Sequence, residues 1–440
     1  MTLEASPTRP RSPLRRRGFA LLWAGGLVSD LGDWTLLIGL PVFVFQLTGS
    51  ALTTSTVFVA ELVPALVVGQ VGGVLVDRWD KRRILVTASV LQAVLLVPLL
   101  AVDHPDRLWI VYLVAAAQSG LARLCAPATA ALVPLLVPGE ELASANGLAA
   151  LAGSLARLIG APVGGLAIQL LGLGGVVAAD AVTFLVAAGL VAAIPAAAAR
   201  SRGASGAHDQ DVAGVPASSA VGRFARDWLN GWRMIASVRG LAALVAIGAA
   251  GQLAQGIFVV LYVVFVLEVL GADGGAVGLI RGMQAVGGIV AGLAVGAIAA
   301  RIGTRTLIGW GFIAFGLLSL VIWNAVLVTT SVPVYAALFA LVGLPGVAAS
   351  VGMVTAVQRL APPTHLGRVF AAYETSSGAL QAVGVLVAGA LADRVGVAPI
   401  LDVQALIYVG CGLAALWLLR APATVGATVG AQGRAAPGGG

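Results

Sequence analysis

The sequence predicts an all-α integral membrane protein with twelve transmembrane helices, arranged as two pseudo-symmetric bundles of six. Three observations lead to this prediction. Of the 440 residues, 59% are hydrophobic and 10% are charged, whereas soluble domains have roughly 45–50% and 25%. The apolar residues fall into twelve runs of about 20 residues or more, the length that an α-helix needs to cross a bilayer. The longest polar segment, 196–239, separates six runs from six.

The spans follow one another between short polar or Gly-containing breaks. In the first half they are expected at 19–46, 51–76, 83–102, 108–136, 142–171 and 174–195. In the second half they are expected at 240–269, 275–300, 305–327, 332–360, 367–392 and 395–419. Only helices or closed barrels satisfy their backbone polar groups in lipid, and these runs lack the alternation of barrel strands. We therefore expect every span to be a helix.

The basic residues predict that both termini are cytoplasmic. Of the 26 Lys and Arg residues, only Arg107 and Arg394 would lie outside, and Arg123, Arg157 and Arg281 lie within spans. Cytoplasmic loops carry an excess of Lys and Arg. The N-in, C-in orientation also supports the number of spans, because one missed helix would scramble this distribution.

The breaks divide the chain into five parts. We expect a basic cytoplasmic tail at 1–17, a six-helix bundle at 18–196, a cytoplasmic linker at 197–239, a second bundle at 240–420 and a disordered cytoplasmic tail at 421–440. The linker begins rich in Gly, Ala and Ser, as flexible linkers are. It ends with four apolar residues at helical spacing, which favour an amphipathic helix on the inner membrane surface. These residues are Phe224, Trp228, Trp232 and Ile235.

The two halves have similar sequences directly after their second spans. The segment 73–83, with Asp77, Arg78, Asp80 and Arg82, aligns with 296–305, where Ala300 replaces the aspartate. Such a parallel duplication is typical of transporters. Small residues four apart, which let helices approach closely, occur in spans two, five, eight and eleven, so we expect these four helices to pack tightly.

These residues resemble the major facilitator superfamily of secondary transporters over nearly the whole chain. The loop 72–83 is similar to that family's signature between helices two and three, and 29–34, 46–52 and 180–184 resemble the branch with enterobactin exporters and macrolide-efflux proteins. The resemblance implies two bundles that rock about a central site, with helices two, five, eight and eleven at their interface. It also implies an exporter element at 160–165, although its proline stands one place late. The residues expected to serve helix packing are Gly160, Pro162, Gly164, Gly165, Gly292 and Gly296.

Charged residues in the middle of spans are the first functional candidates, because each costs at least about 2.5–3.5 kcal/mol to insert. Asp33, Arg123 and Arg157 lie near the bilayer centre. We expect Asp33 to be the main proton-carrying group, with Arg123 as its counter-ion or as a contact to an anionic substrate. Pairing with arginine favours the ionised carboxylate, and an apolar setting favours the protonated one. The alternative is a permanent ion pair that only fixes packing.

Other groups rank behind this pair. Asp30, Glu61 and Glu374 are the alternative proton-coupling groups. Arg157 is a further candidate for a counter-ion or substrate contact, although a structural role with Asp180 is favoured. Arg281 has no obvious partner. The neutral residues expected to bind substrate are Trp34, Gln255, Tyr262 and Gln381. Few charges and several aromatics favour a bulky apolar or cationic substrate over a sugar.

The duplicated loop has a mechanical interpretation. Asp77 can meet the positive N-terminus of a neighbouring helix, and the resemblance suggests span eleven. Such a contact would form a conformational latch of the outward-facing state, for which we expect Gly73, Asp77, Arg78, Asp80 and Arg82. The alternative for the basic residues is plain positive-inside topology.

Together these observations predict a secondary active transporter that exports a small amphipathic compound, such as a drug, macrolide or siderophore-like molecule, by proton antiport. The alternatives are an importer or symporter of the same fold, or a non-transporting membrane sensor or scaffold. No phosphate-binding, nucleophile or metal-ligand motif is present in the sequence, so we expect no enzyme, cofactor or metal. The expected partners are a small-molecule substrate, protons and the lipid bilayer, with no nucleic acid. We expect a monomeric multi-pass protein of the cell membrane.

Overall fold

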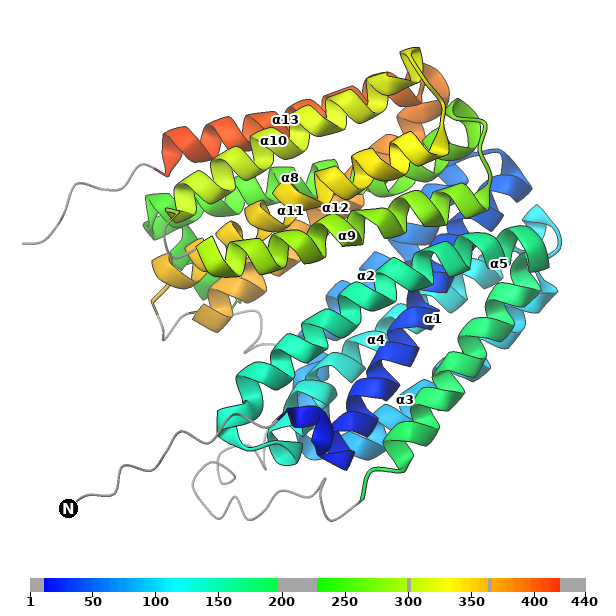
Figure 1. The fold of residues 1–440 in the computed structure, drawn as a ribbon, viewed down its shortest axis with the longest axis vertical. Coiled ribbons are helices and arrows are strands. Elements are labelled where there is room, and N and C mark those ends of the chain that lie inside the picture. The colour runs from blue at the N-terminus through cyan, green and yellow to red at the C-terminus, as the bar shows by residue number, and fades with distance from the viewer. Residues whose placement is uncertain (1–11, 196–227, 299–301, 363–365, 420–440) are drawn as a thin grey trace, which may run out of the picture.

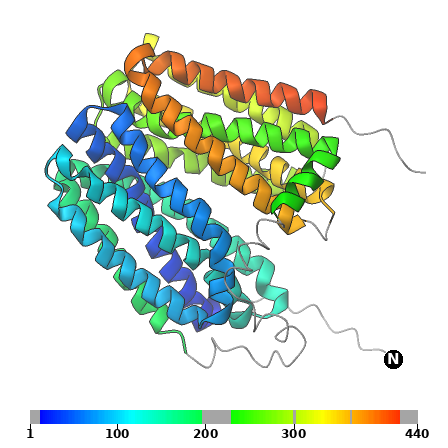
Figure 2. The same ribbon diagram turned by 180° about the vertical axis from the view of Figure 1, so that it is seen from behind.

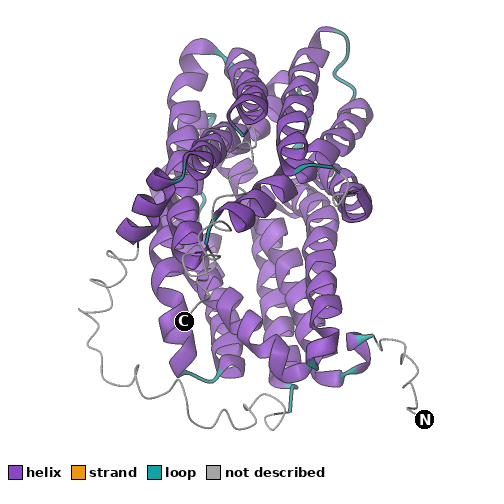
Figure 3. Cartoon of the chain, turned by 90° about the vertical axis from the view of Figure 1, so that its left-hand side faces the viewer, coloured by secondary structure: helices purple, strands orange, loops and turns teal. Residues whose placement is uncertain are grey.

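The computed structural model describes residues 12–195, 228–298, 302–362 and 366–419. Within these ranges every regular element is a helix, and the connections between helices are short (Figure 3). The all-α prediction is therefore confirmed.

The N-terminal half contains five continuous helical segments. They are α1 (Arg17–Thr48), α2 (Ala51–Arg78), α3 (Lys81–Leu96), α4 (Leu108–Leu136) and α5 (Leu142–Ala192). A short 3-10 helix, Val97–Ala101, extends α3. The segment α5 is two helices, because Gly172 has φ 66° and ψ −167° and interrupts the helical backbone. Only glycine adopts such a conformation at little cost, which explains why the break predicted between spans five and six occurs here.

The described residues of the C-terminal half form six long helices. They are α8 (Arg239–Val264), α9 (Gly274–Ile298), α10 (Thr304–Asn324), α11 (Val332–Leu360), α12 (Leu366–Val395) and α13 (Val397–Leu418). Ten helical segments of the described residues are long and apolar enough to cross a membrane. One of these, Gly139–Ala192, spans both helices of α5, and α2 adds a further helix, so each of the twelve predicted spans corresponds to a helix.

The two halves diverge from a common contact region (Figure 1). They touch at the end of the molecule remote from residues 12 and 419 and separate toward the end where those residues lie. Most contacts between the halves join α5 to α9 and α2 to α12 (Figure 2). Helices two, five, eight and eleven of the prediction are these four helices.

Glycines allow this contact between halves. A Cβ atom on Gly165 of α5 would overlap the backbone oxygen of Gly274, and one on Gly278 of α9 would overlap the backbone oxygen of Ala161. On the other side, a Cβ on Gly389 of α12 would overlap the Ser55 hydroxyl of α2. Close backbone approach gives the dispersion contacts on which helices in lipid depend.

Other predicted packing glycines face their own half. Gly160 and Gly164 lie against α1, where a Cβ would overlap the backbone oxygens of Leu31 and Thr35. A Cβ on Gly292 would meet no atom within 4 Å, and the surroundings of Gly296 lie outside the described residues. Glycine spacing marks a close helix contact, but it does not specify which neighbouring helix makes it.

The described part of the linker is helical over residues 228–237. Ile235 is 2% exposed and belongs to an apolar cluster with residues of α8, α11 and α12. Trp228 and Trp232 pack against the same cluster, with ring centroids 6.1 Å apart. A Cβ on Gly231 would overlap the backbone oxygen of Arg368 in α12. The apolar face of this helix is thus covered by the C-terminal half; Phe224 lies outside the described residues.

An ion pair ties the start of α1 to the loop before α5. Arg16 Nε lies 2.8 Å from a carboxylate oxygen of Glu141. The hydrogen bond from Arg16 to Glu141 raises the pKa of this guanidinium. Because Arg16 is solvent-exposed, the pair positions the N-terminus more than it stabilises the fold.

Candidate functional site

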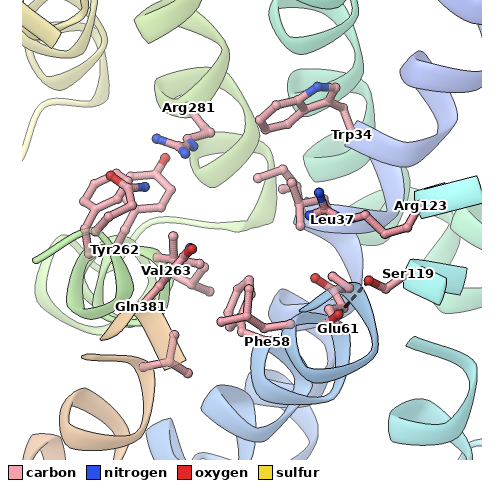
Figure 4. Close-up of a pocket in the computed structure, with 17 residues that line it drawn as sticks. Trp34, Leu37, Phe58, Glu61, Ser119, Arg123, Tyr262, Val263, Arg281 and Gln381 are labelled. Atoms are coloured by element: carbon pink, nitrogen blue, oxygen red, sulfur yellow. Dashed lines mark hydrogen bonds between the residues drawn. The ribbon is translucent and has the colours of Figure 1, made fainter. Parts of the chain in front are cut away.

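A cavity lies between the two halves, near the middle of the helices. It has a volume of about 300 Å³ and is lined by residues of α1, α2, α4, α8, α9 and α12. Figure 4 shows these side chains converging from both halves. Six residues singled out by the sequence line it: Trp34, Glu61, Arg123, Gln255, Tyr262 and Gln381.

Two further spaces share lining residues with this cavity, and the larger of them lies within the C-terminal half apart from Arg157. One, of about 570 Å³, shares Gln255 and Arg281 with the first and adds Arg157 and Glu374. The other, of about 470 Å³, shares Arg123 and Gln381 with the first. We call the three together the central cavity. Volumes of 300–1,000 Å³ are usual for small-molecule sites.

Several neutral polar groups of the cavity wall already form hydrogen bonds within the protein. The Tyr262 hydroxyl donates to the backbone oxygen of Val277 at 2.5 Å, and Ser119 donates to the backbone oxygen of Glu61 at 2.6 Å. The Tyr408 hydroxyl donates to the side-chain oxygen of Gln255 at 3.2 Å. Tyr262 is only 2% exposed, so its hydroxyl contributes a tie between α8 and α9 and its ring forms the wall.

The acidic residues of α1 lie on a different side. Asp30 and Asp33 line a cavity of about 470 Å³ inside the N-terminal half, between α1, α3, α4 and α5. A further space of about 370 Å³, lined by Asp30, Asp33 and Glu61, also contains Trp34 and Ser119 of the central cavity. We call these two spaces the acidic cavity. It connects the carboxylates of α1 with the space between the halves.

The expected pair between Asp33 and Arg123 is not formed in this conformation. Arg123 lines the central cavity, whereas Asp33 faces the acidic cavity. Among the described residues, neither belongs to an ion pair within 4.0 Å. Adjacent residues of a helix point about 100° apart, so Trp34 faces the central cavity while its neighbour Asp33 faces the interior of the half.

Asp180 lies in the second helix of α5, inside the N-terminal half. It is fully buried, and Thr183 donates to its carboxylate at 3.3 Å. The sequence favoured a shared structural role for Arg157 and Asp180, but Arg157 lies elsewhere. Its guanidinium stacks over the Trp34 ring, 4.8 Å from the centroid. Asp180 lies instead against α1, where a Cβ on Gly32 would overlap its carboxylate oxygen.

Arg281 is the functional candidate that sequence reasoning left without a role. Its guanidinium lies 4.8 Å from the centroid of the Phe258 ring and donates to the side-chain oxygen of Gln284. It lines two of the three parts of the central cavity. The feature of the sequence that could have identified it is the position of a charged residue in the middle of a span.

The predicted latch is only partly described. Asp80 caps α3 by accepting from the backbone N–H of Arg83 at 2.9 Å. Arg82 donates to two backbone oxygens at the end of α5, that of Val191 at 3.3 Å and that of Ala192. The surroundings of Gly73, Asp77 and Arg78 lie outside the described residues.

Comparison with known proteins identifies the family. The family model described as Major Facilitator Superfamily matches residues 22–264 and 246–437. Macrolide efflux protein A of Streptococcus pyogenes is 25% identical over 384 residues, covering 86% of this chain and 90% of that protein. An uncharacterised transporter of Mycobacterium tuberculosis, named as MFS-type after the same superfamily, is 28% identical over 384 residues, covering 85% of each chain.

Solved structures agree on the fold. A mutant of the nucleoside transporter NupG has a TM-score of 0.73 at 12% identity, covering 92% of this chain and 100% of that one. A bacterial homologue of the iron transporter ferroportin, in an inward-facing state, has a TM-score of 0.68 at 15% identity, with 93% and 98% covered. Since the family model matches both halves, this multi-pass membrane protein belongs to the major facilitator superfamily of transporters.

Proposed function

We propose that the chain is a secondary active transporter that exports a small amphipathic compound in exchange for protons, by alternating access. The observation that carries this proposal is the junction of two cavities. The central cavity lies between the halves, and the acidic cavity shares Trp34, Glu61 and Ser119 with it. Occupancy of the first can therefore influence protonation in the second.

Asp33 is the proposed main proton carrier, with Asp30, Glu61 and Glu374 as alternatives. Intramembrane carboxylates usually face a polar pathway. Asp33, Asp30 and Glu61 line the same cavity. A proton gradient provides enough energy for such exchange. Each 100 mV is worth about 2.3 kcal/mol per charge, which supports roughly a fiftyfold substrate gradient.

Export is supported by the relative named as a macrolide efflux protein and by the charge distribution. If the termini are cytoplasmic, as the basic residues predict, the conformation described here opens toward the cytoplasm. In the outward-facing state, Gly73, Asp77, Arg78, Asp80 and Arg82 would form the proposed latch, with Asp77 at the start of α12.

Reconstitution tests the proposal directly. The purified chain is placed in liposomes that contain a pH-sensitive dye, and macrolides, siderophores and lipophilic cations are added in turn. We expect one class to drive proton movement in the wild-type protein and none to do so in Asp33→Asn. Asp106→Asn is the matched control, because Asp106 is exposed in the loop before α4.

The outcomes separate the alternatives. Unchanged proton flux in Asp33→Asn excludes Asp33 as the carrier, and Asp30, Glu61 and Glu374 would then be replaced singly. Substrate and proton moving in the same direction would indicate a symporter. No movement of any compound, with the protein correctly folded, would favour the sensor or scaffold.

A further inference from the structure

Three arginines from three helices face the central cavity. Arg123 comes from α4, Arg157 from α5 and Arg281 from α9. Figure 4 shows Arg123 and Arg281 reaching in from opposite sides. Arg281 links the spaces, because it shares one with Arg123 and another with Arg157.

Among the described residues, no carboxylate neutralises any of these guanidinium groups. In the part of the chain that the structure describes, no acidic group lies within 4.0 Å of any of them. Arg157 and Arg281 each stack on an aromatic ring at 4.8 Å. Stacking fixes the plane of a guanidinium and leaves its N–H edge free of the ring, which is the geometry that binds carboxylates and phosphates. In Arg281 one terminal nitrogen already donates to Gln284, and the residue lines the cavity.

The charges of the cavity do not balance. Its described lining contains these three arginines and two carboxylates, Glu61 and Glu374. Asp30 and Asp33 line the acidic cavity instead, and Asp180 is fully buried. Arginine keeps its proton in proteins, so the excess positive charge persists at every physiological pH.

We propose that the substrate carries a planar anionic group, such as a carboxylate, which binds Arg281 and Arg157 while its apolar body lies against Phe258 and Trp34. Charges in a membrane are normally compensated by an opposite charge, and here the missing partner would arrive with the substrate. The sequence alone favoured an apolar or cationic compound, because it did not show that three arginines line one cavity while Asp30 and Asp33 line another. The transport of this anion rests on the proposed function; its binding does not.

A charge series on one apolar body tests the proposal. The probes are pyrenebutyrate, pyrenebutanol and a pyrenebutyl trimethylammonium salt, and their binding to the purified full chain in detergent is followed by fluorescence. We expect pyrenebutyrate to bind most tightly. Arg281→Gln and Arg157→Gln should weaken its binding about tenfold to a hundredfold, the range for a hydrogen bond to a charged group, and leave pyrenebutanol unchanged.

Two further variants separate a specific contact in the cavity from a general effect of charge. Arg281→Lys keeps the positive charge and should restore part of the affinity for pyrenebutyrate. Arg233→Gln removes an equal charge from the exposed face of the linker helix and should change nothing. Melting curves of all variants in detergent show whether the fold is intact.

Several results would overturn the proposal. They are equal binding of pyrenebutyrate and pyrenebutanol, tightest binding of the trimethylammonium probe, absence of pyrenebutyrate binding, and an equal loss for anion and alcohol in Arg281→Gln. Binding is measured without a pH gradient. Failure of proton exchange in liposomes would therefore contradict the proposed function and leave this inference standing.

Discussion

Arg82 and Arg305 make the same contact in the two halves of the molecule. Arg82, at the start of α3, donates to the backbone oxygens of Val191 and Ala192 at the end of α5. Arg305, at the start of α10, donates to the backbone oxygen of Leu416 at the end of α13. The two arginines occupy aligned positions of the duplicated loop. Each ties the third helix of its half to the last one.

Replacing either arginine should destabilise its own half. The last carbonyls of a helix are unsatisfied and carry negative partial charge. Arg82→Gln and Arg305→Gln should each cost about 1 kcal/mol, measured as a lower melting temperature in detergent. Arg83→Gln is the control, since its exposed side chain lies next to Arg82. A control that melts as early as Arg82→Gln would contradict a specific role.

The arginine pair shows what the sequence could predict. Aligned segments and apolar runs are local properties, so they gave the duplication, the twelve helices and the break near Gly172. Contacts between helices are not local. Gly160 and Gly164 pack on α1, and Asp33 faces away from Arg123, because a periodic pattern shows which residues share a face but not which helix covers that face.

Gly164 provides a test of the contact between α1 and α5. A Cβ there would overlap the backbone oxygen of Thr35, and backbone cannot move aside as a flexible side chain can. Gly164→Ala should therefore cost about 1–3 kcal/mol. Gly153→Ala in the same helix is matched, because its Cβ would meet no atom within 4 Å and alanine favours the helix by up to about 1 kcal/mol. Melting curves should separate the two; equal stability would contradict the described contact.

The linker helix is expected to be part of the C-terminal fold. Ile235 is 2% exposed, whereas Leu229 on the same helix is 46% exposed. Ile235→Ala should lower stability by about 2–4 kcal/mol and speed proteolysis around residue 230, while Leu229→Ala should have little effect. If both variants behave alike in melting and proteolysis, the helix is not docked as described.

Gly278 should control which end of the molecule is closed. A Cβ on Gly278 would overlap the backbone oxygen of Ala161 across the contact between α9 and α5. This contact exists only where the halves meet, so Gly278→Ala should penalise the present conformation and leave each half folded. A cost of about 1–3 kcal/mol shifts the ratio of two conformations by roughly 5- to 150-fold.

Cysteine labelling measures this shift. In a background without Cys125 and Cys411, Gln381→Cys places one thiol in the central cavity. A membrane-impermeant maleimide should label it from the side of the chain termini in the starting protein, and from the opposite side once Gly278→Ala is added. Gly292→Ala is the matched control in the same helix, since its Cβ would meet no atom within 4 Å. The steric argument fails if the two glycine variants show the same sidedness, because a Cβ on Gly278 would overlap the other half and a Cβ on Gly292 would not.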